Sequence, residues 1–150
     1  MKKILIVFLF IITSCGYQPL YKVDVDKDKI KIRGIEFVGD KTLGKRIYSG
    51  LILEIMENNT SLNKLVLNSK KNIFETSKNS RGQTISYRTS LDVKLSFFNN
   101  NNELIKEKTL SKNFSYNIQE NKFKFKEYQI NVENNLKNKI IEDINIYLNF

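Results

Sequence analysis

The sequence predicts an α+β fold, a two-layer sandwich in which two helices pack on one face of a four-stranded, mostly antiparallel sheet. Two observations carry this prediction. Apolar residues recur at every fourth position in residues 42–58 and 128–148, as in amphipathic helices, and they alternate with polar residues in 84–97 and 104–118, as in half-buried strands. The order strand, helix, three strands, helix buries every apolar stripe when both helices lie on one face of the sheet.

The first predicted strand and helix occupy residues 30–58. Residues 30–38 alternate as a strand, but the parity of the apolar positions changes at Gly34. A bulge at this glycine would bring all four apolar side chains of the strand to one face. Thr42 is a suitable N-cap for a helix that is expected to run to residue 58.

Three further strands are expected in the middle of the chain. Residues 64–77 are rich in Val, Leu, Ile and Phe, and a slip in parity at Lys70 and Lys71 indicates a strand with a bulge there. Residues 79–82 form a turn. In 84–97 the apolar residues take one parity and the polar residues the other, so we expect one core face and one wet face.

The last strand, residues 104–118, follows a turn at 99–102 and carries lysines among its apolar positions. Lys106, Lys108 and Lys112 share the parity of the apolar residues. This pattern indicates either an edge strand protected by charge or lysines whose stems lie along apolar surface. The closing helix, 128–148, completes a single domain that is assigned to residues 30–150.

The N-terminal segment has the features of an export signal. Lys2 and Lys3 precede nine apolar residues, 4–12, which are too few to cross a bilayer core that takes about 20. Two small residues then lead to Cys15, the only cysteine in the chain, and this sequence resembles a bacterial lipobox. We therefore expect residues 1–14 to be removed as a signal peptide. The alternatives are an uncleaved N-terminal anchor or a coincidental cysteine after an ordinary signal.

Cys15 would then be the first residue of the mature protein, with a thioether-linked diacylglyceryl group and an acylated amine. Three acyl chains hold a protein far more firmly than the marginal anchoring of a single chain. Gly16 stands where lipoproteins of the inner membrane often carry Asp, which favours the inner leaflet of the outer membrane. Residues 15–29 would be a lipidated tether, extended at Pro19.

The charge of the mature chain favours anionic partners. Without Lys2 and Lys3 it has 23 basic and 16 acidic residues, a formal charge of +7. Export excludes nucleic acid and leaves lipid phosphates or acidic polysaccharide. The alternative is that abundant Asn, Lys and Ile reflect a genome rich in A and T.

The composition excludes most enzyme chemistry. The chain has no histidine and its single cysteine is assigned to lipid, so a Ser-His or Cys-His pair and a His- or Cys-ligated metal site are excluded. Carboxylate pairs remain, but Glu54 with Glu57 and Glu103 with Glu107 are expected on solvated positions of a helix and a strand. We expect no enzyme activity, no catalytic residue, no metal and no cofactor.

Residues 15–21 read Cys-Gly-Tyr-Gln-Pro-Leu-Tyr, which resembles the mature N-terminus of the lipopolysaccharide-assembly lipoproteins of the LptE type, particularly those of α-proteobacteria. Residues 86–91 and 114–117 are also similar to that family, as is the order of elements. Residues 44–48 depart from it, because many members carry an Arg-Asn-rich stretch there. The resemblance therefore implies no function for that surface.

The resemblance implies a non-enzymatic partner of the large outer-membrane β-barrel that inserts lipopolysaccharide into the outer leaflet. Such a lipoprotein plugs the barrel, helps it assemble and binds lipopolysaccharide in a secondary role. Arg forks and Lys charges suit a phosphorylated headgroup, and our candidate contacts are Lys78, Arg81, Arg88 and Lys94. The alternatives are that these are ordinary solvated charges, and that the protein is a free-standing periplasmic lipid- or peptidoglycan-binding lipoprotein.

Overall fold

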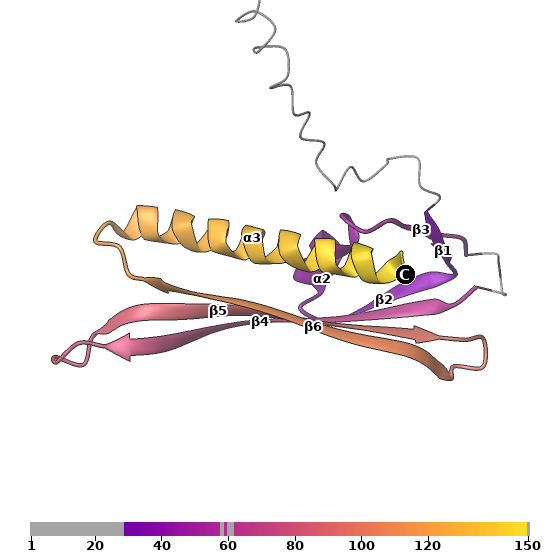
Figure 1. Ribbon diagram of the computed structural model, residues 1–150, viewed down its shortest axis with the longest axis horizontal. Coiled ribbons are helices and arrows are strands. Elements are labelled where there is room, and N and C mark those ends of the chain that lie inside the picture. The colour runs from indigo at the N-terminus through magenta and orange to yellow at the C-terminus, as the bar shows by residue number, and fades with distance from the viewer. Residues whose placement is uncertain (1–28, 58, 60–61, 150) are drawn as a thin grey trace, which may run out of the picture.

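Two helices lie on one side of a long four-stranded sheet, and no described helix or strand covers the other side (Figure 1). The computed structural model describes residues 29–57, 59 and 62–149. The helices are α2 (Lys41–Tyr48) and α3 (Lys122–Leu148). In order across the sheet, the strands are β2 (Gly34–Gly39), β4 (Lys64–Lys78), β5 (Thr84–Phe98) and β6 (Leu104–Asn117). Within this sheet β2 and β4 pair in parallel and the other neighbours are antiparallel, so the predicted α+β fold class is confirmed.

The predicted strand 30–38 is wrong in one respect, because it is two strands that belong to different sheets. β1 (Ile30–Ile32) pairs in parallel with β3 (Leu53–Ile55) in a small second sheet, whereas β2 starts the large one. The chain bends at Arg33, whose backbone N–H donates to Asn63, and no bulge forms at Gly34. The apolar residues of both strands still reach the same core, because the change of sheet reorients the chain.

The predicted helix 42–58 is also wrong in its cap and its length. Asp40, not Thr42, is the N-cap, and its Oδ1 accepts from the Leu43 amide at 3.0 Å. The helix ends at Tyr48. Asn145 of α3 then holds the chain in a different path, because its side chain donates to Gly50 O at 3.0 Å and accepts from the Ile52 amide at 3.1 Å.

The β4–β5 hairpin keeps a continuous register where the sequence predicted a bulge. Lys70 pairs with Asp92 and Lys71 with Leu91 without interruption, and the irregularity lies later, between Glu75 and Lys78. Lys71 keeps its place on the helix-facing side because its charge is paired there with a carboxylate of α3. The alternation of facing and outward side chains therefore continues through Lys71. In the sequence alone, a lysine at an apolar position looks like a slip in this alternation.

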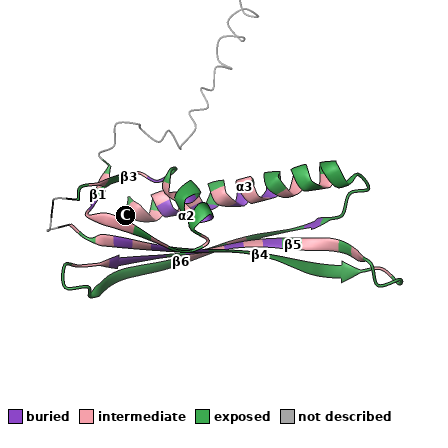
Figure 2. Cartoon of the chain, turned by 180° about the vertical axis from the view of Figure 1, so that it is seen from behind, coloured by how far each residue is buried: buried purple, intermediate pink, exposed green. Residues whose placement is uncertain are grey.

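The core lies between the sheet and the helices, where Figure 2 shows the buried segments. The odd-numbered positions of β5 face the helices as predicted, and Leu91, Val93 and Leu95 are fully buried. The apolar stripe of α3, in which a buried residue recurs at every fourth position, packs against them. Its buried residues are Val132, Leu136, Ile140 and Ile144. This alternation and this stripe are confirmed.

The lysines of β6 behave as expected for side chains whose stems lie along apolar surface at an edge strand. β6 is at one edge of the sheet. Lys106 and Lys108 place their ammonium groups 4.2 Å and 5.6 Å from the centre of the Tyr147 ring, and Lys112 Nζ lies 2.6 Å from Asp143 Oδ2. Each lysine thus connects the sheet edge to α3.

Candidate binding surfaces

The side of the sheet that faces away from the helices, which we call the open face, is a polar surface. Asp92 lies at its middle and accepts from Ser111 Oγ at 2.5 Å and from Asn72 Nδ2 at 3.3 Å. These contacts join β4, β5 and β6 across the face. No element of the described chain covers the open face (Figures 1 and 2). The sequence predicted this wet face from the polar parity of 84–97.

Ion pairs on the open face lower the pKa of its glutamates. Lys94 Nζ lies 2.9 Å from Glu107 Oε1, and Lys64 Nζ lies 2.6 Å from Glu36 Oε2. Hydrogen bonding to these lysines, followed by their charge, holds the pKa of each glutamate below the ordinary value of 4.5. Both carboxylates therefore stay ionised at neutral pH.

The four candidate lipopolysaccharide contacts follow one hairpin and are not gathered in one pocket. Arg81 lies in the turn, and Lys78, just before it, is 3.4 Å from Glu75. Arg88 and Lys94 share the open face, but six residues of strand separate them by about 20 Å. Arg88 Nε donates to Ser115 Oγ at 3.1 Å, whereas Lys94 is paired with Glu107. A headgroup could contact one part of this row at a time.

Arg88 has an apolar neighbour that the sequence analysis missed. Phe74 is its cross-strand partner on β4 and is 52% exposed. Ile73 and Ile85 are about half exposed as well, but they lie on the helix-facing side of the hairpin. An exposed ring beside a guanidinium suits an amphipathic ligand better than a purely polar one. The sequence does carry a signal for it, because the side chains of adjacent apolar residues in a strand point to opposite faces of the sheet.

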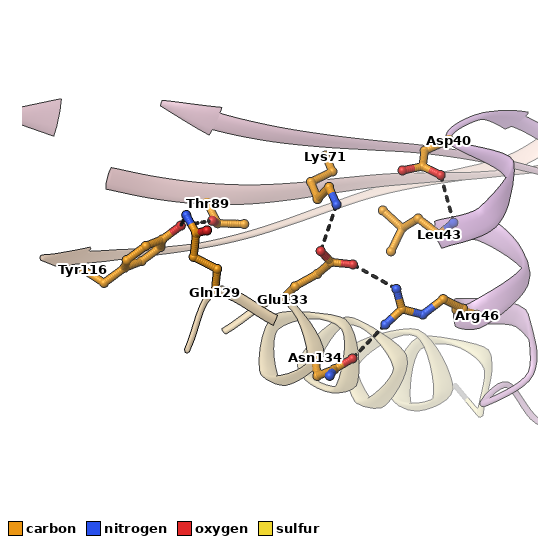
Figure 3. Close-up of polar contacts among 9 residues, drawn as sticks. All are labelled: Asp40, Leu43, Arg46, Lys71, Thr89, Tyr116, Gln129, Glu133 and Asn134. Carbon is orange, nitrogen blue, oxygen red and sulfur yellow. Dashed lines mark hydrogen bonds and ion pairs between the residues drawn. The ribbon is translucent and has the colours of Figure 1, made fainter. Parts of the chain in front are cut away.

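A polar clamp fixes the helices over the sheet (Figure 3). Glu133 of α3 reaches Arg46 of α2 at 3.0 Å and Lys71 of β4 at 2.9 Å, and Arg46 also donates to Asn134 at 2.8 Å. Glu133 is mostly buried, with 18% of its side chain exposed. These residues lie far apart in sequence, and no local pattern pointed to them. The clamp connects α2, α3 and β4 on the side of the sheet opposite the open face.

A second polar contact lies inside the core. Thr89 Oγ1 and Tyr116 OH are 2.9 Å apart, and Gln129 Nε2 donates to the same phenol oxygen at 3.2 Å (Figure 3). Thr89 and Tyr116 are buried, so their hydroxyl groups need these partners. The contact sets the register between α3 and the two strands.

The carboxylate pairs considered from the sequence are not arranged as a catalytic pair. Glu54 lies in β3 rather than on a helix. Glu103 accepts from Asn99 Nδ2 at 2.7 Å, and Glu107 is engaged by Lys94. Among the described residues, no group of three acidic or other ligating side chains is placed to hold a metal ion. Cys15 lies outside the described residues.

A groove of about 390 Å³ runs between α3 and the edge strand β6. Phe114 of β6 forms one wall and is about half exposed. Tyr128, Val132 and Leu136 of α3 provide an apolar lining, and Asn135 and Lys139 add polar groups. We call this the edge groove. No sequence pattern predicts this groove, because it depends on how α3 lies over the sheet edge.

None of the helices in the described ranges combines the length and the apolar character that crossing a membrane requires.

The fold is similar to that of bacterial lipoproteins of known structure. Neither a protein-family model nor a curated protein matches the sequence. Rare lipoprotein B from Shewanella oneidensis matches with a TM-score of 0.51 and 11% identity, over 78% of this chain and 99% of that one. Lipoprotein B from Nitrosomonas europaea gives 0.54 and 9%, over 77% and 79%, and a minor lipoprotein from Acinetobacter baumannii gives 0.52 and 13%, over 79% and 89%. At such identities the similarity shows a shared fold.

Proposed function

We propose that this protein is an outer-membrane lipoprotein of the lipopolysaccharide-assembly type, which plugs and helps assemble the β-barrel that inserts lipopolysaccharide into the outer leaflet. The observation that carries the proposal is a lipobox at Cys15 in a chain whose domain has the fold of bacterial lipoproteins. No residue performs chemistry in this role. The protein acts by occupying and stabilising a partner.

The open face supports the plug role. It is polar across three strands, it carries paired charges, and nothing in the described chain covers it. A polar face of this kind fits the water-filled lumen of a barrel, where interfaces retain bridging waters. A lipid anchor at Cys15 would keep the domain at the inner leaflet and raise its effective concentration near the barrel.

Affinity purification tests the barrel partner. A C-terminally tagged copy is isolated from detergent-solubilised membranes, and the recovered proteins are identified by mass spectrometry. Recovery of one large outer-membrane β-barrel in stable proportion is the expected result. Recovery of the lipoprotein alone would instead favour the free-standing periplasmic lipid- or peptidoglycan-binding lipoprotein, with the open face as its ligand surface.

Lipopolysaccharide binding is the secondary role, with Lys78, Arg81, Arg88 and Lys94 as the contacts. Arg88 is the strongest of the four, because its guanidinium has a hydroxyl partner, forms no ion pair with any described residue, and lies beside the exposed Phe74. Charge reversal at all four positions should weaken binding of purified lipopolysaccharide. Reversal at Lys122, Lys124, Lys126 and Lys137 of α3, which changes the charge by the same amount outside the edge groove, is the matched control. Equal binding by both sets would remove this role.

A further inference from the structure

The outer edge of β6 presents backbone groups that are ready to pair with another strand. β6 bonds β5 on one side, and no strand of the described chain lies on the other. The Ile118 amide donates to Ile85 O, which sets the phase of the ladder. Because antiparallel partners alternate, even-numbered residues of β6 bond β5 and odd-numbered ones direct their N–H and C=O outward. These outward residues include Thr109, Ser111, Asn113 and Ser115.

The side chains along this edge leave the backbone accessible. From Thr109 to Asn117 the outward-bonding residues are Thr, Ser or Asn, with no charge and no proline. Lysines often protect a sheet edge, but Lys106, Lys108 and Lys112 are directed to Tyr147 and Asp143 of α3. These lysine side chains therefore point to the helix side and do not cover the outward backbone groups of β6.

The edge groove lies where the side chains of an added strand would go. Phe114 faces the helix side of the sheet and forms one wall, and α3 forms the other with Tyr128, Val132 and Leu136. A fifth strand beyond β6 would direct every second side chain to this side of the sheet, next to Phe114. The groove provides apolar surface for those residues.

Charge determines which kind of strand fits. On the helix-facing side of this edge, Lys106, Lys108, Lys112 and Lys139 outnumber Glu142 and Asp143, whereas Glu107 of β6 lies on the open face and is paired with Lys94. A second copy of this chain would bring its own lysines opposite these, in a domain that is already basic. An extended segment with acidic residues is complementary instead.

We propose that β6 and the edge groove bind an extended, acidic polypeptide segment of another protein by strand addition. The segment pairs its backbone with Thr109, Ser111, Asn113 and Ser115. The side chains that it directs to the helix side include apolar residues, which enter the groove beside Phe114, and carboxylates, which meet the lysines on the same side. This site is separate from the open face, and the inference does not depend on the proposed function.

The test uses the full chain in detergent micelles and a synthetic peptide in which every second residue is Val or Glu and the residues between them are Thr, so that Val and Glu share one face of the strand. Two measurements are made: the dissociation constant, and hydrogen exchange at the amides of β6. We expect saturable binding that slows exchange at Thr109, Ser111, Asn113 and Ser115. The matched control is the same peptide with N-methyl groups on the amides that would bond β6. It should bind at least about tenfold more weakly.

Variants of Asn113 isolate the edge of β6. Asn113→Pro removes an outward N–H and no bond to β5, and proline is tolerated at such positions of edge strands. It should weaken peptide binding about tenfold, whereas Asn113→Ala, which keeps the N–H, should bind within about twofold of the native chain. Circular dichroism checks that both variants are folded, and the N-methylated peptide gives an independent answer if Asn113→Pro is not.

Several outcomes would overturn the proposal. Equal binding of the methylated and unmethylated peptides would show that the peptide binds through side-chain contacts in the groove, without backbone pairing to β6. Absence of binding by the native chain would remove the site. Slow exchange at the same amides without peptide, together with a dimer in sedimentation, would assign the edge to a second copy.

Discussion

Lys112 of β6 and Asp143 of α3 form an ion pair, with 2.6 Å between Nζ and Oδ2. The lysine lies on the helix-facing side of the strand, two residues from Phe114, which has the same orientation. The pair explains why a lysine interrupts an apolar pattern, because its stem covers core surface and its charge meets a carboxylate on the helix above. About a third of each side chain is exposed, so solvent weakens the attraction.

A double-mutant cycle measures this contact. We predict a coupling energy of about 0.5 kcal/mol between Lys112→Ala and Asp143→Ala, from urea unfolding of the single and double variants. The coupling should fall as salt is raised, because the pair is partly exposed. A coupling of zero in low salt would show that the pair does not form in solution.

Glu133 should contribute more than this exposed pair. Glu133→Gln removes the charge that Arg46 and Lys71 share, and we predict a loss of about 1–2 kcal/mol in the free energy of unfolding. Glu127→Gln, at an exposed position on the same helix, is the control and should change stability by less than about 0.5 kcal/mol. Equal effects of the two changes would contradict the clamp.

The buried hydroxyl pair can be tested in the same way. Tyr116→Phe leaves Thr89 and Gln129 without their shared partner, and we predict that the free energy of unfolding falls by about 1–2 kcal/mol. Adding Thr89→Val removes one of the unsatisfied groups, so the double variant should be more stable than the sum of the single changes predicts. Strict additivity would show that the two hydroxyl groups do not interact.

The pKa of Glu107 depends on Lys94. Hydrogen bonding and the charge of this lysine lower the pKa of Glu107 from 4.5, so the pair stabilises the fold above that pH and the contribution is lost as pH falls through the lower, folded-state pKa. Lys94→Met should raise the pKa of Glu107 towards 4.5 in an NMR titration. Glu36, paired with Lys64, should keep its lowered pKa in the same variant. No change at Glu107 would contradict the assigned cause.

Local periodicity predicted the parts of the fold that depend on neighbours in sequence. The alternation of β5, the lysines of β6 and the stripe of α3 each require only a repeat of two or of about four residues, and each is confirmed. The α+β layering follows from them, because two amphipathic helices need one apolar sheet face. The polar parity of β5 likewise predicted the open face.

The parts that were wrong or missed depend on distant residues. After Tyr48 the apolar spacing fits a helix as well as a strand. Asn145, nearly a hundred positions later, binds the backbone of Gly50 and Ile52 and so favours the non-helical path that leads to β3. The position of Lys71 depends on Glu133 of α3 in the same way. The edge groove requires the placement of α3 over β6, for which the sequence has no local signal.

The most direct test of the central claim is the intact mass of the protein isolated from separated inner and outer membranes. The account predicts a chain that begins at Cys15, carries a diacylglyceryl group and an acylated amine, and is enriched in the outer membrane. A chain that still begins at Met1, or a Cys15 without lipid, would contradict the lipoprotein assignment and with it the proposed role at the barrel.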